Sequence, residues 1–200
     1  MQFQDHAHPN PMPNMTQKTK MAYWLVSHCK TENKREDYVA ELQKYIDIDI
    51  YGTCGPLNFV KDLDKEKEIL IPQYKFYIAF ENSYCNEYVT EKFYHHIGRG
   101  IIPIVMGSMN YRTIAPEKSY IDVKDFKSPK DLADHLKFLD KYDGQYLKYF
   151  EWTKNVKYHV LRPMCELCKK LHDPSQPVQY YRNLSDWWIH DDKHNLDCEY

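Results

Sequence analysis

Residues 74–107 read YKFYIAFENSYCNEYVTEKFYHHIGRGIIPIVMG. The apolar runs at 74–80 and 101–106 are short and rich in aromatic and β-branched side chains, which predicts two buried strands. Between them, residues 89–98 have the apolar periodicity of a helix. The side chains on its apolar face are Val89, Phe93 and Ile97. A strand, a helix and a second strand in this order indicate one unit of a parallel sheet.

The same alternation continues on both sides of this unit. Further strands are predicted at residues 22–26, 46–51 and 120–123, and further helices at 33–45, from Ser128 onward and at 145–160. The predicted fold class is therefore α/β, with a Rossmann-like parallel sheet that carries helices on both faces. Sheets of this kind bind ligands at the carboxyl ends of their strands, so candidate functional residues are expected there.

Composition divides the chain into three parts. Residues 1–20 are rich in Pro, Asn, Gln and His and predict a flexible arm. Residues 21–160 contain the strands and helices of the domain, and residues 161–200 form a cysteine-containing tail that we expect to pack on it. Within the domain, the mixed charge run at 61–68 is expected on a solvated loop or helix face.

Charge and hydropathy exclude several classes of protein. The 200 residues carry 27 Lys and Arg against 29 Asp and Glu, so no basic surface is expected to hold a nucleic acid. The longest apolar runs are much shorter than the ~20 residues of a membrane-spanning helix. The cysteines, together with the glycosylation sequons at Asn14 and Asn183, favour a secretory compartment.

Four polar side chains follow the strand at 74–80 and surround the start of the next helix. Lys92 places a positive charge where a phosphate group would bind, and the first turn of a helix also attracts anions. Glu91 offers two acceptor oxygens that suit the paired hydroxyls of a ribose. Asn82 can donate and accept hydrogen bonds, and Tyr88 offers a flat ring and a hydroxyl. The alternative is an ordinary first-turn glutamate beside a solvated lysine.

A second group of candidates follows the strand at 22–26. Ser27 comes directly after this strand, and Arg35 lies in the first turns of the next helix. A guanidinium group binds phosphate oxygens with two parallel hydrogen bonds, so Arg35 is a candidate phosphate ligand. The alternative is a surface ion pair between Arg35 and Glu32 or Glu36.

Two short motifs leave a metal site open. Asp47-Ile-Asp49 is the D-x-D pattern with which many sugar-nucleotide enzymes hold a divalent metal, but it lies inside an alternating strand. Cys165-Glu-Leu-Cys168 has the spacing of half a zinc site, which His172 and Cys198 would complete. Oxidation to disulfides is the alternative for these cysteines, and no residue is assigned as a metal ligand.

The segment Tyr77-Ile-Ala-Phe-Glu-Asn-Ser83, followed by Tyr88-Val-Thr-Glu-Lys92, closely resembles the donor-binding motif of the α-1,3-fucosyltransferases, glycosyltransferase family 10. The similarity covers residues 21–200. It includes Ser27-His-Cys29, Asn33-Lys-Arg-Glu-Asp-Tyr38, Asp49-Ile-Tyr-Gly52, Pro103-Ile-Val-Met-Gly107, Ser128-Pro-Lys-Asp-Leu132 and Tyr149-Phe-Glu-Trp152. The resemblance implies the C-terminal, donor-binding half of a GT-B-type glycosyltransferase, whose N-terminal half holds the acceptor.

The same resemblance implies a role for each candidate residue. Arg35 and Lys92 would hold the diphosphate of GDP-fucose, and Glu91 would bind the ribose hydroxyls. Ser27 would approach the nucleotide. The other residues of the donor pocket would be Tyr77, Asn82 and Tyr88. The catalytic base is not assigned, because the resemblance places it in an N-terminal half that this sequence does not match.

The implied reaction is an inverting transfer of L-fucose from GDP-fucose to the 3-hydroxyl of N-acetylglucosamine. The cysteines and the tail are most similar to enzymes that modify the core of glycoprotein N-glycans. The implied partners are GDP-fucose and an N-glycan acceptor, without nucleic acid and without a tightly bound cofactor; a divalent metal would only be stimulatory. The expected location is the Golgi lumen, within a type II membrane protein whose anchor precedes this sequence.

Three alternatives to this reaction stay open. The protein would be a Lewis-type enzyme if it fucosylates the outer branches of glycans instead of the core. It would be a catalytically inactive module if it binds GDP-fucose without transferring the sugar. An unrelated α/β carbohydrate-binding protein of the lumen would not bind the nucleotide at all.

The cysteines are expected to be oxidised in such a lumen. Cys29 and Cys54 follow neighbouring strands, so they are expected to form a disulfide bond with each other. The second expected bond joins Cys165 and Cys168. This assignment leaves two cysteines to join each other: Cys85 and Cys198.

Overall fold

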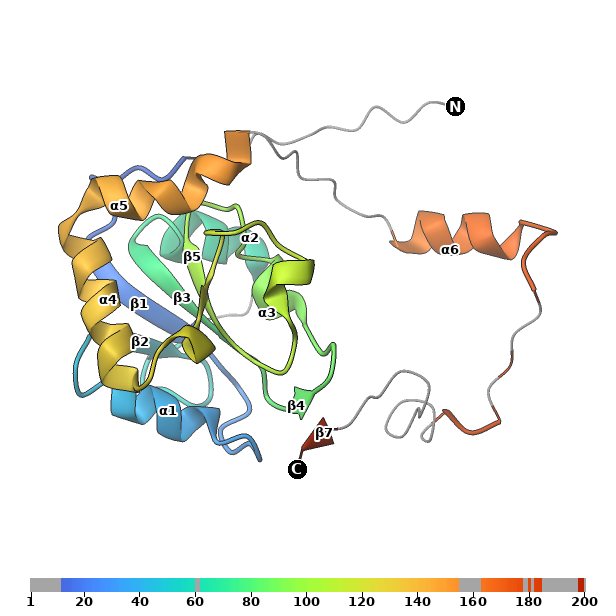
Figure 1. The fold of residues 1–200 in the computed structure, drawn as a ribbon, viewed down its shortest axis with the longest axis horizontal. Coiled ribbons are helices and arrows are strands. Elements are labelled where there is room, and N and C mark those ends of the chain that lie inside the picture. Colours follow the sequence, from blue (N-terminus) through green and yellow to red (C-terminus); the bar gives the residue numbers. More distant parts are fainter. Residues whose placement is uncertain are drawn as a thin grey trace.

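The computed structural model describes residues 12–59, 62–154, 163–177, 180, 182–184 and 198–199. Its core is a five-stranded parallel sheet in the order β2-β1-β3-β5-β6 (Figure 1). The strands span Lys20–Leu25 (β1), Ile48–Tyr51 (β2), Tyr74–Phe80 (β3), Ile102–Met106 (β5) and Ile121–Asp122 (β6). The predicted α/β fold class, with a Rossmann-like parallel sheet, is confirmed.

The strand β3 lies at the centre of the sheet, and all of its side chains are buried. Successive side chains of a strand point to opposite faces, so β3 contributes to two apolar clusters. Phe76, Ile78 and Phe80 belong to one cluster, and Tyr77 and Ala79 belong to the other. The sheet is therefore covered on both faces, as a continuous apolar run in a parallel strand requires.

Helices and single turns complete the two clusters. The helices on the face of Phe76 are α1 (Arg35–Leu42), α4 (Pro129–Lys141) and α5 (Asp143–Leu147), which continues into the 3₁₀ segment Lys148–Lys154. The elements on the face of Tyr77 are the π-helical turn Glu66–Leu70, α3 (Glu91–Tyr94) and the 3₁₀ turn Tyr111–Thr113. The short helix α2 (Leu63–Lys65) directly precedes the π-helical turn. A further 3₁₀ turn, Val123–Asp125, follows β6.

Three helices differ from their predicted bounds. The helix predicted at 33–45 is the shorter α1, Arg35–Leu42. The helix predicted at 89–98 is only the four-residue α3, and turns follow it as far as Gly98 and Gly100. Both glycines have positive φ angles, +72° and +78°, which end a helix in the left-handed region. The helix predicted at 145–160 is divided between α5 and the 3₁₀ segment, and residues 155–160 lie outside the described residues.

The folded domain begins before the expected boundary at residue 20. Lys18 is buried, and its ammonium group donates hydrogen bonds to the carbonyl oxygens of Ile71 (2.8 Å) and Tyr74 (2.6 Å). Lys20 is the first residue of β1. The prediction of a flexible arm is therefore wrong for these two lysines, while residues 1–11 lie outside the described residues.

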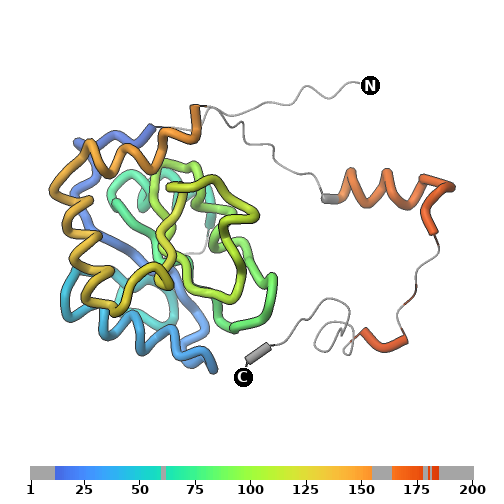
Figure 2. The backbone as a smooth tube through the Cα atoms, in the orientation of Figure 1, coloured from blue at the N-terminus to red at the C-terminus, as the bar shows by residue number. Residues whose placement is uncertain are grey.

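Two elements of the C-terminal tail are described. The first is the α-helix α6 (Pro163–Leu171), which is visible in the backbone trace of Figure 2. Its described side chains are exposed. The second is β7 (Cys198–Glu199), which pairs antiparallel with β4 (Tyr84–Cys85) of the domain. In this pairing the disulfide-bonded Cys85 lies opposite Cys198. The packing of the whole tail on the domain stays a prediction.

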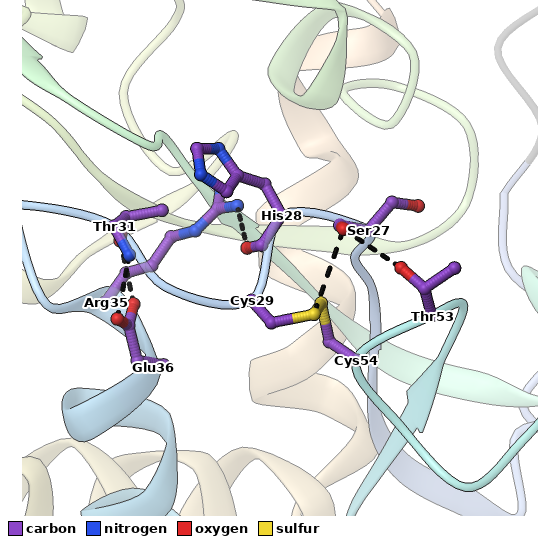
Figure 3. The surroundings of a disulfide bond; sticks show 8 residues. All are labelled: Ser27, His28, Cys29, Thr31, Arg35, Glu36, Thr53 and Cys54. Carbon is purple, nitrogen blue, oxygen red and sulfur yellow. Dashed lines mark hydrogen bonds between the residues drawn. A yellow bond between two sulfur atoms is a disulfide. The ribbon is translucent and has the colours of Figure 1, made fainter.

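The cysteines confirm one expected disulfide bond and contradict another. Cys29 and Cys54 are bonded, which ties the loop after β1 to the loop after β2 (Figure 3). Cys165 and Cys168 are free thiols on α6, so the bond expected between them is wrong. Residues three apart on a helix have Cβ atoms about 5–6 Å apart, whereas a disulfide needs about 3.5–4.5 Å.

Two expectations about the surface concern glycosylation and membranes. Asn14 and Asn183 are both exposed, and their glycosylation stays a prediction. Among the helices of the described residues, none is long and apolar enough to cross a membrane.

Candidate functional site

A cleft of about 250 Å³ opens where β1 and β3 end. Most of the residues predicted from the sequence line this cleft: Ser27, Arg35, Tyr77, Asn82, Glu91 and Lys92. The remaining one, Tyr88, does not line it and instead donates a hydrogen bond from its hydroxyl to Oδ1 of Asn82 (3.0 Å). Residues that are up to 65 positions apart in the sequence, from Ser27 to Lys92, are thus brought to one place.

Arg35 is fixed by the backbone around it. It is the first residue of α1, and its side chain is buried. The guanidinium group donates hydrogen bonds to the carbonyl oxygens of Phe80 (2.7 Å) and His28 (3.1 Å; Figure 3). It also lies over the ring of Trp24, with its central carbon 5.5 Å from the ring centre. The loop after β1 and the end of β3 therefore hold this cation at the wall of the cleft.

The alternative position for Arg35, in a surface ion pair with Glu32 or Glu36, is wrong because the side chain is buried. Glu36 instead accepts hydrogen bonds from the backbone N–H and the hydroxyl of Thr31 (2.8 and 2.7 Å). Burial lowers the pKa of Arg35, and nearby carboxylates, Glu81 first, oppose this shift. Because a guanidinium group keeps its proton in proteins, Arg35 is a permanent positive charge.

Lys92 is held by a carboxylate that the sequence analysis did not assign. Its Nζ lies 2.8 Å from Oε2 of Glu81 and 2.6 Å from the hydroxyl of Thr90. Glu81 is 0% exposed and also accepts the backbone N–H of Thr90 (2.8 Å). The side chain of Lys92 is 20% exposed and lines the cleft. The buried carboxylate therefore orients the cation toward the cleft without enclosing it.

The sequence position of Glu81 is consistent with its pairing with Lys92 and could have indicated it. It is the first residue after the buried strand β3, between Phe80 and the predicted Asn82. A charged side chain at that point is either solvated or paired, and Lys92 is the cation of the same motif. The helix was also expected to attract an anion through its N-terminal dipole. Because α3 has only four residues, this dipole is weak, and the charges of the side chains contribute more.

Three further buried side chains form the wall behind Tyr77, and the sequence analysis missed them. The ring of His96 stacks on Tyr77, with ring centres 3.4 Å apart and planes 12° apart. Its Nε2 lies 3.0 Å from Oε1 of Glu66, which also accepts the hydroxyl of Tyr23 (2.9 Å). Its Nδ1 lies 2.7 Å from the carbonyl oxygen of Lys92. This network joins β1, the π-helical turn and the segment after α3.

The solvated position expected for the charge run at 61–68 is wrong for Glu66, which is 3% exposed. Its described neighbours Lys65, Lys67 and Glu68 are exposed, as expected. The π-helical turn buries Glu66 together with Leu70, four residues later, so one face of the charged segment points inward. The spacing of these two residues was the available signal.

The D-x-D motif is used for other contacts. Asp49 forms an ion pair with Lys20 (3.0 Å) and accepts a hydrogen bond from the hydroxyl of Tyr74, while Asp47 is exposed. On α6, the Sγ atom of Cys168 lies 3.7 Å from Nδ1 of His172. Across the part of the chain that the structure describes, no group of three or more His, Cys, Asp or Glu side chains is placed to hold a metal ion.

The amino-acid sequence is similar to those of known fucosyltransferases. Residues 15–187 match the family described as "Glycosyltransferase family 10 (fucosyltransferase) C-term". The chain is 41% identical over 174 residues to alpha-(1,3)-fucosyltransferase C of Drosophila melanogaster, covering 86% of this chain and 41% of that protein. It is 45% identical over 177 residues to glycoprotein 3-alpha-L-fucosyltransferase A of the same organism, covering 86% of this chain and 35% of that protein.

A solved structure gives the same result for the fold. The crystal structure of an alpha1,3-fucosyltransferase with GDP-fucose superimposes with a TM-score of 0.60 and 25% identity, over 84% of this chain and 51% of that chain. The chain thus spans about half or less of the length of these relatives.

Proposed function

Because the chain belongs to the fucosyltransferases of glycosyltransferase family 10, we propose that its cleft binds the donor GDP-fucose for an α-1,3-fucosyltransferase reaction. The observation that carries this proposal is the convergence of two cations and two acceptor side chains on one cleft beside the strand ends of a parallel sheet. The solved alpha1,3-fucosyltransferase with GDP-fucose has a similar fold, which supports the choice of donor.

The two cations are suited to the diphosphate. Each terminal nitrogen of Arg35 uses one N–H for a backbone carbonyl, which leaves a second N–H on each for phosphate oxygens. Lys92 is already oriented by Glu81, so little side-chain entropy is lost when it binds an anion. When the bond between fucose and the diphosphate breaks, negative charge grows on the diphosphate, and these two residues stabilise it.

The remaining residues are suited to the nucleoside. We assign Glu91 to the ribose hydroxyls, because its carboxylate lines the cleft next to Lys92. Asn82 lines the cleft and is oriented by the hydroxyl of Tyr88, so Tyr88 acts through Asn82. Tyr77 and Ser27 complete the pocket.

The proposed reaction inverts the configuration at the fucose C1 and joins the sugar to the 3-hydroxyl of N-acetylglucosamine in the core of glycoprotein N-glycans. The acceptor and the base that removes its proton are assigned to the N-terminal half of the enzyme, which this chain does not match. The similarity to glycoprotein 3-alpha-L-fucosyltransferase A of Drosophila melanogaster supports a glycoprotein as the acceptor. The Cys29–Cys54 disulfide supports an oxidising compartment, and we propose the Golgi lumen, within a type II membrane protein.

Calorimetric titration of the chain with GDP tests the donor site. We expect Lys92→Gln to weaken GDP binding more than tenfold, that is by more than about 1.4 kcal/mol, because it removes the charge. Glutamine is preferred to alanine because it still offers the buried Glu81 a hydrogen-bond donor. The matched control is Lys137→Gln, an exposed lysine on α4, which should bind GDP like the unaltered chain. Equal GDP affinity in Lys92→Gln and the control would refute the site.

A transfer assay with labelled GDP-fucose, on an enzyme that includes the acceptor-binding half, tests the acceptor. Product on the N-glycan core supports the proposed reaction, whereas product only on outer-branch N-acetylglucosamine identifies a Lewis-type enzyme. GDP-fucose binding without any product identifies an inactive module.

A further inference from the structure

Within the part of the chain that the structure describes, hydrogen bonds reach only one of the two oxygens of the buried Glu66 carboxylate. Oε1 accepts hydrogen bonds from the Tyr23 hydroxyl (2.9 Å) and from Nε2 of His96 (3.0 Å). Among the described residues, no donor contacts Oε2. Glu66 as a residue is 3% exposed, so an oxygen that has no partner in the described fold is available to a donor on a ligand.

This free oxygen belongs to the cleft. Glu66 is one of the lining residues, and so is Leu63, one turn earlier on the same face. A ligand bound in this cleft therefore lies against Glu66 and can supply a hydrogen-bond donor to its carboxylate.

Glu66 is ionised in this position. Burial raises the pKa of its carboxyl group, but the hydrogen bond and charge of His96, together with the Tyr23 hydroxyl, outweigh burial and bring the pKa below its usual value. Both ring nitrogens of His96 face acceptor oxygens, Oε1 of Glu66 and the carbonyl of Lys92. An ionised carboxylate accepts hydrogen bonds and donates none.

The charge of the carboxylate decides which part of a nucleotide it faces. A phosphate group would be repelled by Glu66 and attracted to Arg35 and Lys92, which line the same cleft. The wall around Glu66 is instead suited to a flat, weakly charged ring, because Leu63, Leu25 and the ring of His95 also line the cleft. Burial lowers the pKa of His95, so its ring is neutral at neutral pH.

The geometry points to Glu66 as the residue that reads the nucleotide base, with Oε2 accepting hydrogen bonds from the N1–H and the 2-amino group of guanine. This inference rests on the proposed function, since the diphosphate held by Arg35 and Lys92 places the nucleotide in the cleft. Adenine presents a bare N1 acceptor at the corresponding edge, which a carboxylate repels. Hypoxanthine keeps the N1–H and lacks the 2-amino group. Tyr23 and His96 are positioning residues that hold the carboxylate in its place.

Titration of the chain with GDP, IDP and ADP tests the inference without any substitution. We expect IDP to bind at least threefold more weakly than GDP, and ADP at least tenfold more weakly. Equal affinity for GDP and ADP would overturn the role of Glu66, although the diphosphate site would stand. If none of the three nucleotides binds, the proposed function itself fails, so the two failures are distinguishable.

Two variants then assign the preference to a side chain. Glu66→Gln should weaken GDP at least tenfold and leave the affinity for ADP within threefold, because its amide N–H₂ replaces an acceptor with a donor. Glu68→Gln, on the exposed side of the same turn, is the matched control and should keep the full preference for GDP. An equal loss of GDP and ADP affinity in Glu66→Gln would mean that Glu66 only supports the fold, and would overturn the inference.

A third variant separates base reading from folding. Tyr23→Phe removes one of the two donors that position the carboxylate, so the ratio of GDP to ADP affinity should fall at least threefold while the affinity for ADP stays within threefold. If Glu66→Gln does not fold, the ratios of GDP to IDP and ADP affinity in the unaltered chain and in Tyr23→Phe decide. An unchanged ratio in Tyr23→Phe, with intact folding by circular dichroism, would contradict a reading by the positioned carboxylate.

Discussion

Lysine side chains lie near both ends of the sheet, and their surroundings differ. At the amino ends of the strands, the buried Lys18 donates to two backbone carbonyl oxygens, and the buried Lys75 contacts Asp140 (2.9 Å). At the carboxyl ends, Lys92 contacts the buried Glu81 and keeps 20% of its exposure on an open cleft. The first two lysines have their hydrogen bonds supplied by the fold, whereas Lys92 is oriented and left accessible.

This difference shows that a buried or half-buried cation does not by itself identify a site. Carbonyls or carboxylates hold the cations at both ends, but only Arg35 and Lys92 of these described cations share a cleft with acceptor side chains. Cations of this kind are preorganised for an anion. The lysines at the amino end, in contrast, contribute to the stability of the fold.

The largest effect is expected from the covalent link at the carboxyl end. Replacing both Cys29 and Cys54 by alanine should lower the free energy of unfolding by about 3 kcal/mol, because the disulfide closes a loop between residues 25 positions apart. Urea unfolding under non-reducing conditions measures this loss. Cys168→Ala, which removes an exposed free thiol, is the control and should change stability by less than about 0.5 kcal/mol. Equal stability of both variants would mean that the link does not hold the loops of the cleft.

At the amino end, Lys18 should make stability depend on pH. Burial first, and then the charge of Lys75, lower the pKa of Lys18 to about 7 from 10.5. Between these two values the unfolded chain binds more protons than the folded chain, so stability rises with pH. We expect a gain of about 2 kcal/mol from pH 7 to pH 9, and Lys18→Met should remove this part of the slope.

Urea unfolding at a series of pH values measures this slope, with Lys137→Met as the exposed control. A pH slope that is unchanged in Lys18→Met would show that the carbonyl oxygens of Ile71 and Tyr74 keep Lys18 charged in the folded chain.

At the cleft, the guanidinium of Arg35 should not be replaceable by an ammonium group. Arg35→Lys loses the planar fork that contacts two carbonyls and a phosphate together, so GDP affinity should fall about tenfold, or about 1.4 kcal/mol. Calorimetric titration measures the affinity. The control is Arg112→Lys, whose side chain is 81% exposed, and it should bind GDP unchanged. Unchanged binding in Arg35→Lys would mean that Arg35 supports the fold and does not bind the nucleotide.

Much of the carboxyl end could be predicted from the sequence. The strand at 74–80 was predicted with its observed bounds, because a long apolar run between polar segments specifies a central parallel strand. Asn82, Glu91 and Lys92 were predicted because all three lie within 12 residues of the end of this strand, in the loop and helix that follow it. Short-range order therefore identified the part of the cleft that β3 and α3 contribute.

The missed residues depend on contacts between distant segments. Glu66 and His96 are 30 residues apart, and the local pattern around Glu66 is a charged run that indicates solvent. Lys18 precedes the first strand in a polar segment, and only the arrangement of the chain near residues 71–74 buries it. A pattern within one segment cannot show which other segment covers it, so these buried polar pairs needed the structure.

The smallest effect is expected from the exposed ion pair at the amino end. Lys20 and Asp49 are 3.0 Å apart, but their side chains are 45% and 37% exposed. Water screens such a pair, so Lys20→Ala should lower the free energy of unfolding by at most about 0.5 kcal/mol. Asp49 keeps its hydrogen bond from the hydroxyl of Tyr74, which limits the loss further. Lys75→Ala is the buried counterpart on the same end, and should cost several times more because it leaves the site of a buried cation empty. Urea midpoints of the two variants decide: if Lys20→Ala costs as much as Lys75→Ala, exposure does not separate the lysines of this end, and the Lys20–Asp49–Tyr74 contacts act as one buried network.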